Sequence, residues 1–201
     1  MNRPSKYEHY LHLARVLAER GTCLRRNYGA IIVNNDEIVS TGYTGTPRGV
    51  KNCCDIGKCH REMLGCKPDE RYDLCKSVHA EQNAIISAAR RDMIGGTMFL
   101  AGLQASDLST ISDTPPCYIC QRFIINAGLK SVVIEISPSF GAELDSRRYL
   151  QVPWKEISVS SFAIGMTLTR EKWEDNQTPV TEVSSNPSEE EGLDESFEER
   201  L

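Results

Sequence analysis

The chain has 201 residues, 40% of them hydrophobic and 25% charged, which is ordinary for one globular domain with extensions. Its net charge of −5 is unevenly distributed, because ten acids and one base fall within residues 174–201. The remaining 22 bases and 18 acids give residues 1–173 a charge of +4, too small an excess to indicate a nucleic-acid-binding surface. The N-terminal residues contain no continuous apolar run, which argues against a secretory signal or a membrane span and favours a cytoplasmic protein.

In chain order, the first predicted element is an amphipathic helix that begins after Ser5, because Ser5 and Glu8 have the spacing of a capping box. Residues 29–33 and 37–41 are β-branched and apolar and are separated by Asn34-Asn35-Asp36, a pattern that predicts a β-hairpin.

Residues 46–76 follow with little apolar periodicity. A stretch of this length is unusual unless it is functional or cross-linked. Five of the eight cysteines lie here: Cys53, Cys54, Cys59, Cys66 and Cys75. The cytosol keeps thiols reduced, so metal ligation is favoured over disulfides, which would be the ordinary interpretation for a secreted chain. We therefore predict a cysteine-rich, metal-stapled insertion.

A second helix is predicted from His79, where strong helix formers begin, up to the break at Gly95-Gly96. Further strands are expected at residues 97–101, 131–136 and 155–159, and a helix at 117–127. This alternation predicts an α/β fold: a three-layer α/β/α sandwich with a central mixed sheet. The folded domain should cover residues 1–173, and the acidic residues 174–201 should form a disordered tail because they contain few large apolar side chains.

Two short motifs carry the chemistry. His79-Ala80-Glu81 opens one predicted helix, and Pro116-Cys117-Tyr118-Ile119-Cys120 opens another. The two motifs match the signature of zinc-dependent deaminases, in which one histidine and two cysteines hold the metal. Because His79, Cys117 and Cys120 supply only three ligands, the fourth position stays open for water, which distinguishes a catalytic zinc site from a structural one.

Glu81 is the predicted catalytic residue. It lies two residues from His79, so it projects elsewhere on the first turn and can move protons instead of binding the metal. In a cytosine ring, water would attack C4 while Glu81 passes the proton to N3 and assists the departure of ammonia. The alternative is a structural zinc knuckle or a redox pair, which Cys-x-x-Cys motifs often form when they occur alone.

These motifs resemble the deoxycytidylate (dCMP) deaminases of the cytidine deaminase superfamily. Beyond residues 79–86 and 116–120, residues 28–33 resemble the V-G-A strand of the family, and residues 41–47 resemble its T-G-Y-N-G-x-P segment. The similarity covers roughly residues 5–137. It implies a mixed sheet with helices on both faces, and zinc-dependent conversion of dCMP to dUMP and ammonia, which supplies dUMP for thymidylate synthesis.

The resemblance also implies a homo-oligomer, commonly a hexamer, that is activated by dCTP and inhibited by dTTP, with Mg²⁺ accompanying these nucleotides. Many members hold a second, structural zinc at cysteines that correspond to Cys23, Cys53, Cys59 and Cys75. From spacing alone, other residues could also be ligands of this second zinc: Cys54, Asp55, His60 and Cys66. No nucleic-acid or membrane partner is expected.

One departure from the family pattern concerns the substrate. Thr44 stands where the family usually has an asparagine that is expected to line the nucleotide pocket, so discrimination of the sugar or phosphate can differ. Arg26 is the candidate phosphate contact because the arginine fork matches phosphate geometry, although a solvated basic patch is an equal alternative.

Other functions remain open from the sequence. A related enzyme would act on free cytidine, guanine, a pyrimidine of riboflavin synthesis or adenosine in tRNA. Free cytidine deaminases usually have cysteine where His79 stands, and a tRNA enzyme would need a basic face. A non-catalytic zinc module that binds nucleotides is the alternative from another class, but it would have no need of Glu81.

Overall fold

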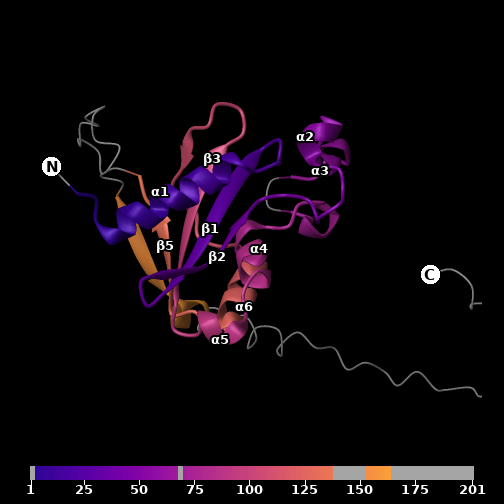
Figure 1. Ribbon diagram of the computed structural model, residues 1–201. Coiled ribbons are helices and arrows are strands. Elements are labelled where there is room, and N and C mark those ends of the chain that lie inside the picture. The colour runs from indigo at the N-terminus through magenta and orange to yellow at the C-terminus, as the bar shows by residue number, and fades with distance from the viewer. Residues whose placement is uncertain (1–2, 68–69, 138–152, 164–201) are drawn as a thin grey trace, which may run out of the picture.

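A single mixed sheet forms the centre of the computed structural model, which describes residues 3–67, 70–137 and 153–163 (Figure 1). The strand order is β2-β1-β3-β5-β6, and β4 pairs with β3 outside this path. β3 and β5 run parallel, and the other neighbours run antiparallel. The strands are β1 (Arg26–Asn34), β2 (Glu37–Tyr43), β3 (Thr97–Gln104), β4 (Thr110–Ile111), β5 (Ser131–Glu135) and β6 (Trp154–Ser158).

Helices cover both faces of the sheet, which confirms the predicted three-layer α/β/α sandwich. α1 crosses one face, and α4, α5 and α6 lie on the other (Figure 1). The capping box predicted at Ser5 and Glu8 is present at the start of α1. The bounds of these helices are α1 (Lys6–Glu19), α4 (Ala80–Ile86), α5 (Arg90–Met93) and α6 (Tyr118–Ala127).

The two cores follow from the alternation of side chains along the strands. Ile31, Phe99 and Val133 pack against α1 on one face. Their neighbours on the same three strands point to the other face and pack with α4 and α6. Because each central strand buries both faces, these strands are almost continuously apolar, as expected for the interior of a layered α/β fold.

The helix that carries the first motif lies unusually close to the sheet. A Cβ atom on Gly42 in β2 would come within 2.3 Å of both the Ala80 carbonyl oxygen and the Ala84 amide nitrogen. Any larger residue at position 42 would therefore push α4 away. Two hydrogen bonds add to this attachment: Ser40 Oγ donates to the Ala84 carbonyl at 2.7 Å, and Asn83 Nδ2 donates to the Tyr43 carbonyl at 2.8 Å.

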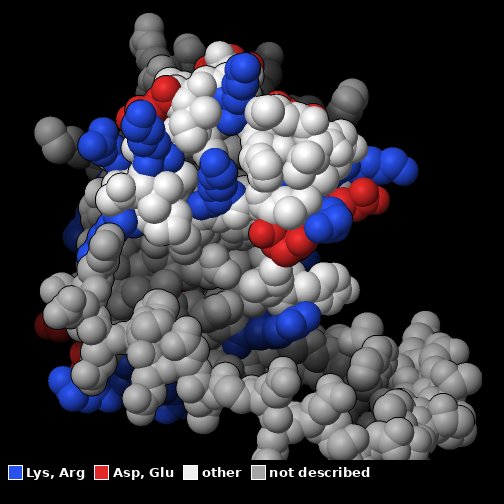
Figure 2. Space-filling view, turned by 90° about the vertical axis from the view of Figure 1, so that its right-hand side faces the viewer, with Lys and Arg blue, Asp and Glu red and all other residues white. Residues whose placement is uncertain are grey.

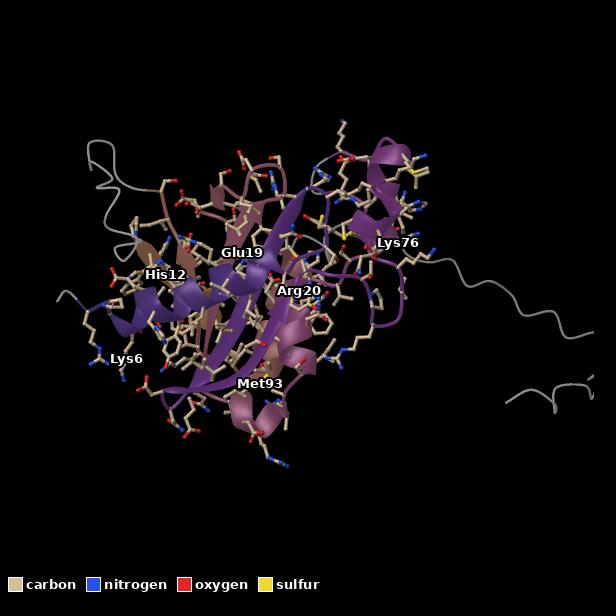
Figure 3. All side chains as sticks on the ribbon, turned by 45° about the horizontal axis from the view of Figure 1, so that its top comes forward. Lys6, His12, Glu19, Arg20, Lys76 and Met93 are labelled. Atoms are coloured by element: carbon tan, nitrogen blue, oxygen red, sulfur yellow. The ribbon has the colours of Figure 1, made fainter. Side chains whose placement is uncertain are left out.

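The cysteine-rich insertion projects from one end of the sandwich (Figure 1). It contains three short turns: α2 (Cys53–Ile56), α3 (His60–Met63) and the 3₁₀ helix η1 (Tyr72–Leu74). Figure 2 shows Lys and Arg side chains spread over this side of the molecule among uncharged residues and a few Asp and Glu side chains. In Figure 3, Lys76 lies at the insertion, whereas Lys6 marks the distant start of α1.

Several expectations need correction or stay untested. The helix predicted from His79 toward Gly95 ends at Ile86 and restarts as α5, because Ser87 Oγ bonds back to the Asn83 carbonyl at 2.7 Å and the chain turns there. β4 was not expected, and the insertion has more local structure than its composition indicated. The proposed tail, residues 174–201, lies outside the described residues. No helix within the described part of the chain is long and apolar enough to cross a membrane.

Candidate active site

His79 is the N-cap residue of α4. Its position therefore depends on how closely α4 packs on the sheet, which the lack of a side chain at Gly42 allows. Its backbone N–H donates to Gln82 Oε1 at 3.1 Å, which satisfies a donor that the helix start would otherwise leave unpaired. The Tyr72 ring meets the imidazole edge-on, with 5.4 Å between ring centroids. The imidazole is thus held by its own helix and by the insertion.

Cys117 is the N-cap residue of α6, directly after Pro115-Pro116. The start of α6 is closed by Gln121, whose side chain donates to the Pro116 carbonyl at 2.8 Å and whose backbone donates to the Cys117 carbonyl at 2.9 Å. Cys120 lies one turn later and is fully buried. The i, i+3 spacing turns both sulfurs the same way, as predicted.

The two motifs meet at three donor atoms. His79 Nδ1 lies 3.5 Å from Cys117 Sγ and 3.4 Å from Cys120 Sγ. All three ligand atoms lie within 4.8 Å of one another. Imidazole and thiolate are the usual ligands of zinc, and three of them leave one tetrahedral position open. The donor set therefore fits a catalytic zinc ion.

The pKa values of the two thiols and of the imidazole depend on one another. A hydrogen bond from the Cys120 thiol lowers the pKa of Cys117 to about 4, and the same bond raises the pKa of Cys120. The Cys117 sulfur in turn raises the pKa of His79, because it stabilises the proton on the ring. A metal ion placed between the three atoms would take over the stabilisation of both thiolates.

Among the described residues that line the cavity, Glu81 is the one carboxylate. Its exposed fraction is only 5%, and burial raises its pKa above the ordinary value while the charge of His79 opposes the shift. Sequence spacing predicted that Glu81 would not be a metal ligand, and it is not part of the group of three donor atoms. A buried carboxyl beside a metal centre can hold and release a proton.

A cavity of about 720 Å³ opens in front of these residues. The predicted substrate contacts Thr44 and Arg26 both line it, together with Arg25 and Arg61. Arg25 pairs with Glu62 at 3.3 Å, and Arg61 lies over the Tyr72 ring at 4.9 Å.

The hydroxyl of Thr44 is already engaged by the protein. Its Oγ1 accepts from the Tyr28 N–H at 2.9 Å and donates to the Tyr28 carbonyl at 3.4 Å. Thr44 therefore lines the cavity with its hydroxyl already bonded to the backbone of Tyr28.

A second, smaller cavity of about 270 Å³ lies beside the first, within the insertion. The four cysteines predicted to bind structural zinc all line it: Cys23, Cys53, Cys59 and Cys75. His60 lines it too, whereas Cys54 and Cys66 do not. Among the residues that the structure describes, no three of the four sulfurs come within 4.8 Å of one another. All eight cysteines are free thiols.

Tyr28 and Tyr72 are among the cavity residues that the sequence analysis missed. Tyr28 was noted only as part of a strand, although its position on the same strand face as Ala30 and Ile32 places it beside α4. Tyr72 lies in the insertion, where no periodicity predicts which side chain turns inward.

The family described as "Cytidine and deoxycytidylate deaminase zinc-binding region" matches residues 4–136. The chain belongs to this family. The match confirms the resemblance inferred from the motifs, and it places both motifs within the zinc-binding region of the family.

Relatives differ greatly in how much of their length is shared. A deoxycytidylate deaminase from Schizosaccharomyces pombe is 33% identical over 135 residues, which span 67% of this chain but only 38% of that protein. One from Mycobacterium phage D29 is 32% identical over 138 residues, or 66% of this chain and 96% of the phage protein. The crystal structure of a dCMP deaminase from the cyanophage S-TIM5 in complex with dCMP and dUMP is 28% identical, with a TM-score of 0.47 and coverage of 66% of this chain and 82% of that one.

Proposed function

We propose that the chain catalyses the hydrolytic deamination of dCMP to dUMP and ammonia. The observation that carries this proposal is the convergence of His79, Cys117 and Cys120 beside the buried carboxylate of Glu81, at the wall of an arginine-lined cavity. Membership of the family and the names of the two relatives support the same reaction.

In this proposal His79, Cys117 and Cys120 hold zinc. When bound, the metal acts as a Lewis acid that makes a water molecule at its open position more acidic. The protein supplies the orientation, because each donor stands at or near the start of a helix that packs on the sheet. Neutral imidazole and two thiolates balance the charge of the metal, so no further anion is needed.

Glu81 moves the protons. Its carboxylate accepts a proton from the attacking water, delivers it to ring N3 of the cytosine and then assists the departure of the C4 amino group as ammonia. Because Glu81 is buried, bulk water does not compete for that proton. In this proposal the base lies next to Glu81 and the charged end of the nucleotide lies toward Arg25 and Arg26, and the shared lining of the cavity supports this orientation.

We also propose that Cys23, Cys53, Cys59 and Cys75 bind a second, structural zinc ion. Their shared cavity supports this choice over Cys54 and Cys66. The sulfurs would have to draw together by rotation of side chains and small shifts of the short turns, since a tetrahedral site needs them closer than they lie.

Other properties rest on the family resemblance alone and are proposed with it. They are activation by dCTP, inhibition by dTTP, Mg²⁺ bound with these nucleotides, a hexameric assembly, a cytoplasmic location and the supply of dUMP for thymidylate synthesis. A titration of dCTP and dTTP against activity, with and without Mg²⁺, tests the regulation, and light scattering tests the assembly.

The first experiment is a substrate panel. The zinc-loaded full chain is incubated with dCMP, CMP, deoxycytidine and guanine, with and without dCTP, and ammonia release is followed. The proposal expects the fastest release from dCMP. Release from deoxycytidine but not from dCMP rejects a nucleotide substrate, and no release from any compound favours a zinc module that only binds nucleotides.

Glu81→Gln separates catalysis from metal binding. The variant should retain its zinc and lose about 10²- to 10⁴-fold in turnover, because only the proton shuttle is removed. Glu37→Gln, at an exposed position on β2, is the matched control and should behave like the unmodified chain. Turnover by Glu81→Gln close to that of the control would exclude Glu81 from the reaction.

A further inference from the structure

Tyr28 is a cavity-lining residue to which the proposed reaction gives no role. It is a half-buried residue of β1 whose ring packs against the core on the α4 and α6 face of the sheet. The same ring lines the 720 Å³ cavity together with His79 and Glu81. None of the motifs that define the family's metal centre includes it.

Tyr28 is held at its backbone and is closely packed at its ring. Its backbone exchanges hydrogen bonds with Thr44: each residue's N–H donates to the other, at 2.9 Å to Thr44 Oγ1 and at 2.9 Å to the Tyr28 carbonyl. Across the sheet Tyr28 pairs with Gly102, where a Cβ atom would lie only 2.6 Å from Tyr28 Cε1 and 2.9 Å from Cδ1. The ring therefore occupies the space that any side chain at position 102 would need.

The surroundings of the phenol place it between the two ends of the cavity. Arg26, Tyr28 and Ala30 alternate along one face of β1, Arg26 and Tyr28 line the cavity, and Ala30 packs in the same core as Ala80, the neighbour of Glu81. Tyr28 is thus near both the carboxylate that would serve the base and the guanidinium that would serve the phosphate. In a nucleoside monophosphate, the group between base and phosphate is the sugar.

We propose that Tyr28 is a specificity-determining residue whose fixed ring forms a wall against the sugar and disfavours the extra 2′-hydroxyl of a ribonucleotide. This inference rests on the proposed function and adds the sugar preference of the same site. A hydroxyl pressed against an immobile ring loses its water without gaining a partner, which is costly. An apolar wall of this kind discriminates by a factor of about 10 to 100.

The test compares kcat/KM for dCMP with kcat/KM for CMP. In Tyr28→Val the ring is removed from a strand position that valine suits, and the preference for dCMP should fall at least about tenfold, mainly because CMP improves. In Tyr28→Phe the hydroxyl is lost together with its hydrogen bonds to Thr114 and Arg26, but the ring stays and both substrates carry the same phosphate, so the preference should stay within about threefold of the unmodified chain. Tyr43→Val is the matched control, since Tyr43 lies on the neighbouring strand, is 37% exposed and does not line the cavity.

A second measurement needs no variant. Inhibition of the unmodified full chain by dUMP and by UMP should differ by about the same factor as the substrates, because the products carry the same two sugars. Equal inhibition by dUMP and UMP overturns the proposal even if Tyr28→Val does not fold.

The outcomes separate the two proposals. If the unmodified chain deaminates dCMP and Tyr28→Val keeps the full preference, only the role of Tyr28 is wrong. A loss of preference in Tyr43→Val as large as that in Tyr28→Val also rejects it. If the unmodified chain deaminates neither nucleotide, the proposed function fails, and the sugar preference fails with it.

Discussion

The chain carries two groups of candidate metal ligands, and they are built in opposite ways. His79, Cys117 and Cys120 come from the starts of two helices that pack on the central sheet, and their three ligand atoms already lie within 4.8 Å of one another. The four cysteines of the insertion come from short turns and loops, share a cavity of about 270 Å³ and stay farther apart.

The difference shows what the sheet contributes. A helix start fixed by backbone hydrogen bonds and a close contact such as that of Gly42 can hold a ligand in place before the metal arrives. Turns of three or four residues bury little surface, so their ligands depend on the metal to bring them together. The site of His79, Cys117 and Cys120 should therefore be preorganised for catalysis. The four-cysteine site should instead stabilise the fold of the insertion when it binds metal.

The largest effect is expected at the preorganised site. Cys120→Ser removes a fully buried ligand, so the chain should lose one zinc ion and on the order of 10³-fold in turnover, which corresponds to several kcal/mol of transition-state stabilisation. Its fold should persist, because the sheet and not the metal holds α4 and α6. Metal analysis, ammonia release and circular dichroism measure the three quantities. Cys54→Ser, at an exposed cysteine outside both groups, should match the unmodified chain.

Loss of a ligand from the four-cysteine site should affect stability more than turnover. Cys75→Ser should reduce the zinc content from two ions per chain to one and lower the melting temperature by several degrees, while the remaining zinc still supports turnover. An unchanged zinc content rejects the second site. A complete loss of turnover with one zinc retained would instead show that the insertion is part of the active site and not only attached to it.

Gly42→Ala tests the attachment of α4 to the sheet. The added methyl group would meet the backbone of Ala80 and Ala84, so the free energy of unfolding should fall by about 1–3 kcal/mol. Zinc affinity should fall as well, because His79 moves with the helix. Thr41→Ala, at the exposed neighbouring position, controls for the change in strand composition. Denaturant unfolding with the metal loaded and removed separates the two effects.

The smallest effect is expected at Glu135 of β5, which belongs to neither group of candidate metal ligands, and it concerns the pH dependence of stability. Glu135 is almost fully buried and pairs with Arg15 at 2.8 Å, yet burial raises its pKa more than the arginine lowers it. The folded state thus binds this proton more tightly than the unfolded state, and the associated stability is present below the ordinary pKa and lost as pH rises through the folded value. Glu135→Gln should flatten this decline, which unfolding measured from below the ordinary glutamate pKa up to neutral pH would show.

Features set by neighbouring residues could be predicted from the sequence. The capping box at Ser5 and Glu8 and the glycine that ends α6 act over a few residues, and the structure contains both. The convergence of His79 with Cys117 and Cys120 was also predictable, because both motifs stand at helix starts and their residue types share one metal chemistry.

Features set by distant contacts could not be predicted. The turn after Ile86 depends on the Ser87 side chain bonding backwards, a choice that helix-forming residues do not signal. The engagement of Thr44 by Tyr28 depends on the pairing of separate segments. β4 is only two residues long and is defined by its pairing with Gly102 and Leu103 of β3. In the insertion, the absence of periodicity hid three short turns.

The parallel pairing of β3 with β5 has a consequence for biosynthesis. Antiparallel strands can be joined by a tight turn, but a parallel pair needs a long crossover, and here α6 lies within it. His79 is made well before the crossover, and both sulfur ligands are made during it. A nascent chain that ends before residue 117 therefore has the α4 imidazole but no complete donor set. The three donor atoms can therefore come together only after the crossover helix has been made.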